Sequence, residues 1–139
     1  MQTFRHSFPS ELYHVKPVLR DALGFIRSHF SRLPEADECD LRLILSELLL
    51  NAVIHGNRGD TRKSVSLSLD IRDGVVSCTI TDEGEGFDYR ALLAGFAEAA
   101  GCESEHGRGV RIAFALSDAM QFNMSGNAIF FRKKVAGDA

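Results

Sequence analysis

The stretch ELLLNAVIHGN occupies residues 47–57 and overlaps the end of a predicted helix at 38–54. Apolar residues occupy almost every side of that helix. A helix with so little polar surface is buried inside a domain rather than laid on its outside. Glu47, Asn51 and His55 are the exceptions, and their spacing of four places them on one stripe of that helix. Because polar side chains on a buried helix need a partner, water or a ligand, we expect this stripe to face a site.

The segment that follows this helix predicts a β-hairpin. Residues 64–71 alternate polar and apolar side chains, the pattern of a strand with one wet face. Asp73 and Gly74 are a strong signal for a tight hairpin turn, and residues 76–81 alternate again as the return strand. The return strand runs directly into the glycine-rich sequence DEGEGF at 82–87.

The remaining predicted elements complete a two-layer arrangement. Before the helix at 38–54 we expect a strand at 2–8 and a helix at 11–30 with Ser10 as its N-cap. After the hairpin we expect a mobile segment at 88–106 with one helical stretch at 91–100. A helix that begins at 107–109 follows, and then strands at 120–124 and 128–135. Helices with an apolar face to bury, together with strands that have one solvent-exposed face, predict an α/β (α+β) two-layer sandwich. We expect a mixed, mostly antiparallel sheet of about five strands, with about three main helices on one face.

The composition of the 139-residue chain fits one globular domain, 1–139, because 45% of its residues are hydrophobic and 25% are charged. A formal net charge of -3 disfavours a protein that binds the phosphate backbone of nucleic acids. No run of residues is long and apolar enough to span a membrane, and the N-terminus lacks a signal-peptide pattern, so a cytoplasmic location is expected. The sequence has 3 cysteines, no two of which are spaced as C-x-x-C, so we expect all of them to be reduced thiols.

Glu47 and Asn51 lie one helical turn apart and suit a metal-assisted reaction. The amide oxygen of Asn51 is a hard ligand of the kind that Mg²⁺ accepts, with water and phosphate oxygens completing the coordination. The carboxylate of Glu47 can then accept a proton from an attacking hydroxyl group or water. Spacing alone leaves an alternative open, in which the pair is only the solvated edge of a helix.

Asp82 ends a buried strand and is followed by Gly84 and Gly86. Glycines let the backbone turn tightly and let a flat ligand approach it closely. A carboxylate at this place can accept a hydrogen bond from an exocyclic amine such as that of adenine. An ordinary glycine turn is the alternative, whereas a calcium-binding loop is excluded because Leu93 stands where such a loop needs a glutamate.

Gly107, Arg108 and Gly109 open a predicted helix. Backbone N–H groups at a glycine-rich helix N-terminus bind phosphate, and the helix dipole favours the negative charge. Arg108 can add a positive charge, although a solvated surface arginine is the alternative. The sequence contains neither the Walker nor the Rossmann glycine pattern, so those two modes of nucleotide binding are excluded.

The three motifs, in this order along the chain, resemble a known family. E-x-x-x-N-A-x-x-H-G-N at 47–57, D-x-G-x-G-F at 82–87 and G-R-G-x-x-I at 107–112 are similar to the N box and the two G boxes of the GHKL ATP-binding superfamily, also called the Bergerat fold. Within it, the short chain and the sequence SELLLNAVIHGN at 46–57 resemble the anti-sigma-factor serine kinases of bacterial partner switching. The resemblance covers residues 1–135.

The resemblance implies binding of Mg·ATP and suggests a role for each motif. Asn51 is the implied ligand of Mg²⁺, Glu47 the implied catalytic base, and Asp82 the implied acceptor for the amine of adenine. The other cofactor-binding residues that it implies are His55, Gly84, Gly86, Gly107, Arg108 and Gly109, with a flexible lid over the phosphates at 88–109.

The resemblance also implies a serine protein kinase that acts as an anti-sigma factor. Members of this family phosphorylate a serine on an anti-anti-sigma partner of the STAS fold, otherwise sequester a sigma factor, and usually form homodimers. Neither nucleic acid nor a membrane is an expected direct partner. Two alternatives remain, a non-catalytic nucleotide-gated binding module and the catalytic half of a split histidine kinase. Glu47 argues against the first, and the lack of length for a phospho-acceptor domain argues against the second.

Two further positions relate this chain to its relatives. Several relatives bind adenine through a threonine in the final strand, whereas this chain has Asn127 after Gly126, so that contact is expected to be absent or made by Asn127. Relatives also dock partners through an arginine on their first helix. Arg20 matches that arginine, and a solvated surface residue is its alternative interpretation.

Overall fold

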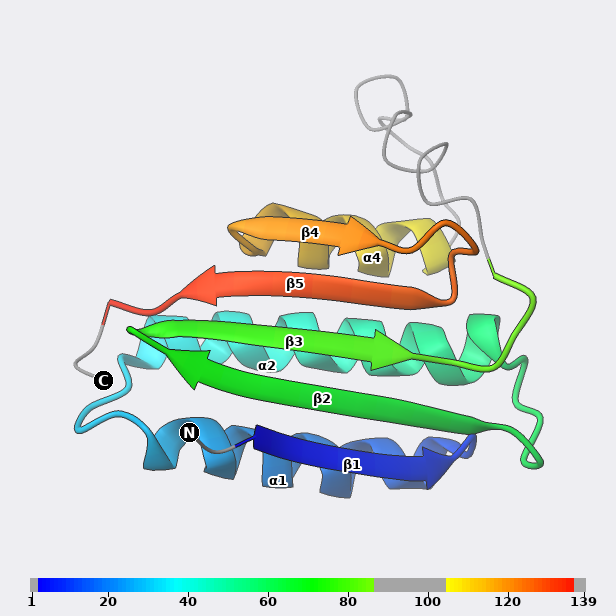
Figure 1. Cartoon of the computed structure of the whole chain (residues 1–139), viewed down its shortest axis with the longest axis horizontal. Coiled ribbons are helices and arrows are strands. Elements are labelled where there is room, and N and C mark those ends of the chain that lie inside the picture. The colour runs from blue at the N-terminus through cyan, green and yellow to red at the C-terminus, as the bar shows by residue number, and fades with distance from the viewer. Residues whose placement is uncertain (1–2, 87–104, 137–139) are drawn as a thin grey trace.

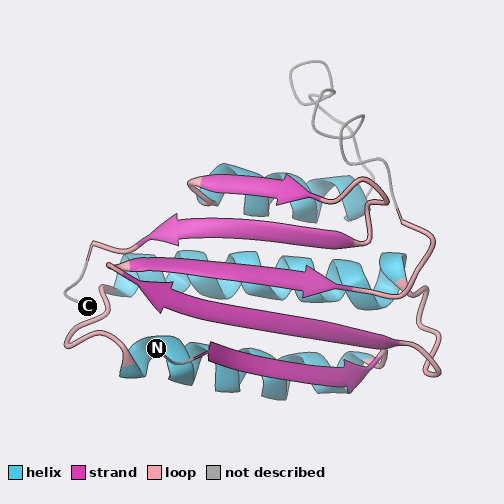
Figure 2. Cartoon of the chain, viewed as in Figure 1, coloured by secondary structure: helices cyan, strands magenta, loops and turns pink. Residues whose placement is uncertain are grey.

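The computed structural model describes residues 3–86 and 105–136, and these form two layers (Figure 1). One layer is a 5-stranded sheet, and the other is a row of helices that covers one face of it (Figure 2). The elements are, in chain order, β1 (Thr3–Pro9), η1 (Leu12–His14), α1 (Val15–Ser28), α2 (Glu35–Asn51), η2 (Ala52–Gly56), β2 (Ser64–Arg72), β3 (Val75–Thr81), α4 (Glu105–Leu116), β4 (Ala119–Phe122) and β5 (Ala128–Lys134). The predicted two-layer α/β sandwich is confirmed.

Neighbouring strands in the sheet run antiparallel, in the order β1-β2-β3-β5-β4. The prediction of a mixed sheet is therefore corrected for the described strands, because none of their pairings is parallel. Asp73 and Gly74 form the predicted turn between β2 and β3, and both have positive φ angles, 53° and 76°. Such angles are typical of a type I′ turn, whose twist matches that of the strands it joins.

The inner face of the sheet and the helices share one hydrophobic core. In β2, Val65, Leu67 and Leu69 are buried, while Ser66 on the opposite face is exposed. The alternation in the sequence is thus the alternation between the two faces of the sheet. Helix α2 lies behind β2 and β3, with α1 on one side of it and α4 on the other (Figure 1). This central place explains why apolar residues surround most of α2.

The N-terminal helix differs from its prediction. The chain first makes a 3₁₀ turn at Leu12–His14, and α1 begins only at Val15. Pro17 then lies in the first turn of α1, where a missing backbone N–H costs no helical hydrogen bond. Ser10 is not the N-cap of this helix, because it is buried and its Oγ donates to the carbonyl oxygen of Val53 at 3.4 Å.

Other boundaries also shift. Helix α2 begins at Glu35 rather than 38, directly after Pro34, because acidic residues in its first turn favour the positive end of the helix dipole. Strand β4 ends at Phe122, before the predicted 124. The helical stretch predicted at 91–100 lies outside the described residues. Among the residues described, no helix is both long enough and apolar enough to span a membrane.

Candidate functional site

The C-terminal end of α2 changes from an α-helix to a single π-helical turn, η2 (Ala52–Gly56). The backbone N–H of Asn57 donates to the carbonyl oxygen of Ala52 at 2.9 Å, which closes this wide turn. Such turns are rare and occur frequently at functional sites. Here the turn directly follows Asn51 and contains His55, so it lies within the predicted polar stripe.

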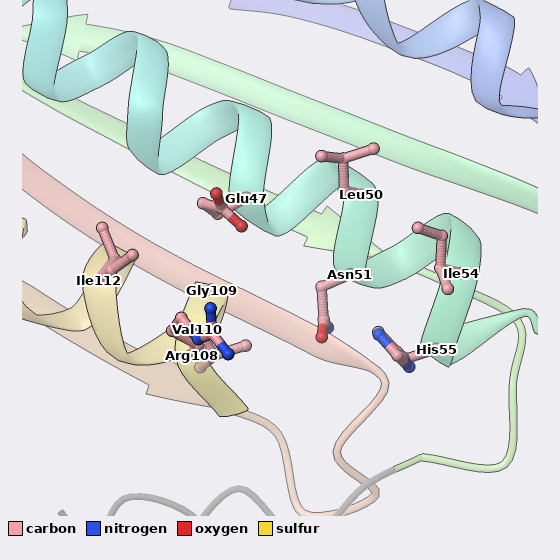
Figure 3. A pocket seen from close by; sticks show the side chains of 9 residues that line it. All are labelled: Glu47, Leu50, Asn51, Ile54, His55, Arg108, Gly109, Val110 and Ile112. Carbon is pink, nitrogen blue, oxygen red and sulfur yellow. The ribbon is translucent and has the colours of Figure 1, made fainter. Parts of the chain in front are cut away.

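A cavity of about 310 Å³ lies between this end of α2 and the N-terminal part of α4. Glu47, Asn51 and His55 line one wall, and Arg108 and Gly109 line the opposite wall (Figure 3). Apolar side chains complete the lining: Leu50, Ile54, Val110 and Ile112. The volume is at the lower end of the range of small-molecule sites, roughly 300–1,000 Å³. The fold thus brings the predicted stripe together with the second glycine motif.

Gly109 brings α4 against the carboxylate of Glu47. A Cβ atom at position 109 would collide with Oε2 of Glu47, so glycine allows the two helices to approach closely here. Glycine inside a helix costs roughly 1 kcal/mol relative to alanine. The close approach explains why a residue with that cost stands in α4, and it places the predicted catalytic base in direct contact with the second glycine motif.

Asn51 is only 6% exposed although its side chain is polar. Its Oδ1 atom is buried and accepts no hydrogen bond within the described part of the chain. No cluster of three or more histidine, cysteine, aspartate or glutamate side chains in residues 3–86 and 105–136 is arranged to hold a metal ion. The oxygen donors of Asn51 and Glu47 fit Mg²⁺, because this ion usually keeps several waters and takes other ligands from a bound phosphate chain.

Asp82 is 6% exposed and is not among the described residues that line the cavity. Its Oδ1 accepts a hydrogen bond from the backbone N–H of Gly84 at 2.8 Å. Burial raises the pKa of this carboxyl group above its ordinary value of 3.8, and the hydrogen bond from Gly84 partly opposes that shift. A buried acid with a raised pKa often marks a functional position.

Glycines allow the tight packing around Asp82. A Cβ atom at Gly56 would collide with the carboxyl group of Asp82, and one at Gly84 would collide with the carbonyl oxygen of Gly56. The end of η2 and the loop after β3 are therefore in close contact. Gly86 has a φ of 95°, and a Cβ atom there would collide with the carbonyl oxygen of Ser125. The first glycine motif thus touches both the end of η2 and the turn between β4 and β5.

Asn127 supports Asp82 from the turn between β4 and β5. The backbone N–H of Asp82 donates to the carbonyl oxygen of Asn127 at 2.9 Å, and Nδ2 of Asn127 donates to the carbonyl oxygen of Asp82 at 3.4 Å. Oδ1 of Asn127 accepts a hydrogen bond from Nδ2 of Asn123 at 2.6 Å. The side chain of Asn127 is therefore engaged within the protein and holds the backbone of Asp82. A direct contact between Asn127 and adenine stays a prediction.

The second glycine motif lies at the N-terminal end of α4, which begins at Glu105 rather than at Gly107. Arg108 is exposed at the wall of the cavity. Most of the predicted lid at 88–109 lies outside the described residues. Arg20 is elsewhere, on α1 in a groove between α1 and α2, with its Nε 3.5 Å from Oδ1 of Asp21. Its role in docking partners stays a prediction.

A known family matches this arrangement of elements and motifs. The family described as "Histidine kinase-like ATPase domain" matches residues 8–133, which is most of the chain. The chain belongs to the histidine kinase-like ATPase family. This match confirms the resemblance of the three motifs to the GHKL superfamily. It runs from β1 into β5, so one histidine kinase-like ATPase domain contains all the described elements that build the cavity.

The chain is also similar to proteins named Anti-sigma F factor. It is 44% identical over 54 residues to the one from Geobacillus stearothermophilus, and the aligned part covers 38% of this chain and 37% of that protein. The Anti-sigma F factor of Geobacillus kaustophilus matches with the same identity, and that of Bacillus licheniformis is 37% identical over 54 residues. The chain spans 37% of the length of these curated relatives.

Several residues that shape the site have contacts that the sequence does not predict. Asn57 is 1% exposed, and Gly56 packs on Asp82. Asn123 and Asn127 organise the turn beside Asp82. A glycine and an asparagine directly after a buried helix, and asparagines on both sides of a short turn, are signals of side-chain to backbone hydrogen bonds. Such signals identify turns but not the distant segment that each side chain contacts.

Proposed function

We propose that this chain binds Mg·ATP, transfers its γ-phosphoryl group to a serine of an anti-anti-sigma protein of the STAS fold, and otherwise sequesters a sigma factor. The observation that carries the proposal is the single cavity in which Glu47 and Asn51 from α2 meet Arg108 from α4. The name of the relatives, Anti-sigma F factor, supports the class of partner. We expect a homodimer, as the resemblance to this group of kinases implies.

In this proposal, different residues bind the Mg²⁺ ion, the phosphates and the adenine base. Asn51 holds Mg²⁺, which supplies positive charge against the phosphate chain when it is bound. Arg108 and the glycines of α4 contact the phosphates, and His55 contributes to the same wall as Asn51. Asp82 accepts a hydrogen bond from the exocyclic amine of adenine, with Gly84 and Gly86 next to the base.

Glu47 is the general base in this proposal. The serine oxygen attacks the γ-phosphorus, a new O–P bond forms, and the bond from that phosphorus to the bridging oxygen of ADP breaks. The serine proton passes to the carboxylate of Glu47. Positioning and neutralisation of charge supply most of the acceleration in such a transfer, so the orientation of Glu47 against Gly109 matters for its rate.

Glu47→Ala tests the assignment of the base. We expect phosphoryl transfer to fall at least about 100-fold, because no other carboxylate among the described residues lines the cavity, while Mg·ADP still raises the melting temperature. Transfer is measured with γ-labelled ATP and a STAS-domain partner as acceptor. Glu35→Ala, which removes an exposed carboxylate at the other end of α2, is the matched control.

The chemical form of the product separates the proposal from its alternatives. Acid-stable phosphoserine on the partner supports the serine kinase. Acid-labile phosphohistidine would instead support the split histidine kinase, and nucleotide binding by wild type without any transfer would support the non-catalytic module. Transfer by Glu47→Ala at the wild-type rate contradicts the role of Glu47 as base.

A further inference from the structure

Three hydrogen bonds form a closed ring between the residue that directly follows η2, the start of β2 and the loop after β3. Nδ2 of Asn57 donates to the carbonyl oxygen of Ser64 at 2.9 Å. The backbone N–H of Ser64 donates to Oε1 of Glu83 at 2.5 Å, and the backbone N–H of Glu83 donates to Oδ1 of Asn57 at 2.7 Å. We call Asn57, Ser64 and Glu83 the Asn57 ring. Each of its members both gives and receives a hydrogen bond.

Asn57 is the buried member of the Asn57 ring. It is 1% exposed, and both polar atoms of its side chain are hydrogen bonded. Its backbone N–H is bonded to Ala52, which ties the residue to η2. Buried polar groups whose hydrogen bonds are all made hold one geometry, because any displacement leaves a donor or acceptor without its bond. The Asn57 ring therefore sets the distance between η2 and the loop after β3.

The Asn57 ring adjoins the buried carboxyl group of Asp82 on two sides. Glu83 follows Asp82 directly in the chain. Gly56, which precedes Asn57, packs so closely on Asp82 that a Cβ atom has no room. A shift of Glu83 relative to Asn57 therefore changes where the carboxyl group of Asp82 lies relative to the helix that carries Asn51.

We infer that Asn57 is a positioning residue, which through Ser64 and Glu83 places Asp82 so that the site selects a base with an exocyclic amine over one with a carbonyl group there. This inference rests on the proposed function, because it takes Asp82 as the group that meets the base. A carboxylate attracts an amine donor and repels a carbonyl oxygen, and both effects depend steeply on distance and angle. Displacement of Asp82 therefore lowers the preference for adenine more than it lowers binding of the phosphates.

The Asn57 ring can be opened at its exposed member without disturbing the core. Glu83→Ala removes the acceptor of the Ser64 N–H, whereas Glu83→Gln keeps an oxygen at that place. Glu85→Ala removes an exposed carboxylate from the same loop and controls for the loss of charge. Asn57→Ala opens the Asn57 ring at its buried member.

The test compares the dissociation constants of Mg·ADP and Mg·IDP, measured by calorimetry for wild type and each variant. IDP carries a carbonyl group where ADP carries the amine. We expect Glu83→Ala and Asn57→Ala to lower the preference for ADP over IDP by about three- to tenfold, the effect of one misplaced hydrogen bond. Glu83→Gln and Glu85→Ala are expected to keep the preference of wild type.

An unchanged preference in Glu83→Ala overturns the inference, and so does an equal loss of affinity for both nucleotides, which indicates a structural role only. If Asn57→Ala does not fold, the inference is tested by whether Glu83→Ala has a lower preference for ADP over IDP than Glu83→Gln has. If wild type binds neither nucleotide, or binds both equally well, the proposed adenine site itself is wrong, and the inference falls with it.

Discussion

Glu47 and Gly109 come from helices far apart in the sequence, yet a Cβ atom at position 109 would displace the carboxylate of Glu47. That carboxylate is the end of a flexible side chain and can move aside. Gly84 differs, because a Cβ atom there would meet the carbonyl oxygen of Gly56, which is main chain and cannot rotate away. Substitution by alanine is therefore expected to impair function at Gly109 and to disturb the local backbone at Gly84.

Gly109→Ala is expected to reduce phosphoryl transfer at least about tenfold by displacing the base. Its free energy of unfolding should stay within about 1 kcal/mol of wild type, because alanine is the better helix former. Gly24→Ala in α1 is the control, since a Cβ atom there meets nothing within 4 Å. Transfer assays and urea unfolding of both variants give the comparison. An unchanged transfer rate in Gly109→Ala would show that the contact with Glu47 has no role in catalysis.

Asp82 makes stability depend on pH in a direction that the structure predicts. Because burial raises its pKa, the folded state holds the proton more tightly than the unfolded state does. As pH rises above the ordinary value of 3.8, the folded state therefore loses stability until the folded pKa is passed. Asp82→Asn removes this loss and keeps an oxygen for Gly84. Without nucleotide, its stability relative to wild type should grow as the pH rises from about 4 until the raised pKa of Asp82 is passed.

Urea unfolding of wild type and Asp82→Asn across this pH range measures the difference. A difference that does not change with pH contradicts the raised pKa of Asp82. The same variant should no longer gain melting temperature from Mg·ADP, because an amide in place of the carboxylate presents a donor to the amine of adenine.

Among the elements, the turn between β4 and β5 serves the site without lining the cavity. Oδ1 of Asn123 accepts hydrogen bonds from the backbone N–H groups of Gly126, Asn127 and Ala128, at 2.9, 3.0 and 3.1 Å. The turn that this one side chain organises holds the backbone of Asp82. The same turn meets Gly86 through Ser125. The first glycine motif therefore depends on an element that follows it by some forty residues in the sequence.

Asn123→Ala should destabilise the fold by about 1–2 kcal/mol, because several backbone donors lose their acceptor at once. It should also weaken the binding of Mg·ADP, since Asn127 would no longer hold Asp82 in place. Met124→Ala is the matched control in the same turn, because Met124 is 100% exposed. If Asn123→Ala is as stable as Met124→Ala, the turn is maintained by other contacts.

Across the whole molecule, α2 and α4 lie side by side on one face of the sheet and enclose the cavity between them (Figure 1). Helices α2 and α4 pack against each other and both cover the same 5-stranded sheet. A nucleotide that contacts both walls should therefore stabilise the complete fold rather than one helix.

Mg·ADP at 100 times its dissociation constant is expected to stabilise wild type by about 2.7 kcal/mol. For a domain of this size, that is a rise of several degrees in melting temperature. Asn51→Ala should lose the part of the rise that depends on Mg²⁺, measured as the difference between melts with and without a chelator. If millimolar nucleotide leaves the melting temperature of wild type unchanged, the cavity is not a nucleotide site.

Local patterns in the sequence predict most of the strands and helices and the segments that carry the candidate chemistry. Period-2 alternation predicted the strands of the β2–β3 hairpin, and Asp73 with Gly74 predicted its turn, because these signals are local in the chain. The polar stripe of Glu47, Asn51 and His55 was predicted in the same way from helical spacing, and it lines one cavity.

Which distant segments meet depends on the packing of the layers. The Asn57 ring, the support of Asp82 by Asn127 and the contact of Gly109 with Glu47 each join residues whose partners no local pattern names. The antiparallel pairing of β3 with β5 is of the same kind. Spacing along a helix or strand shows which face a residue occupies, but the neighbour on that face is set by how the layers pack.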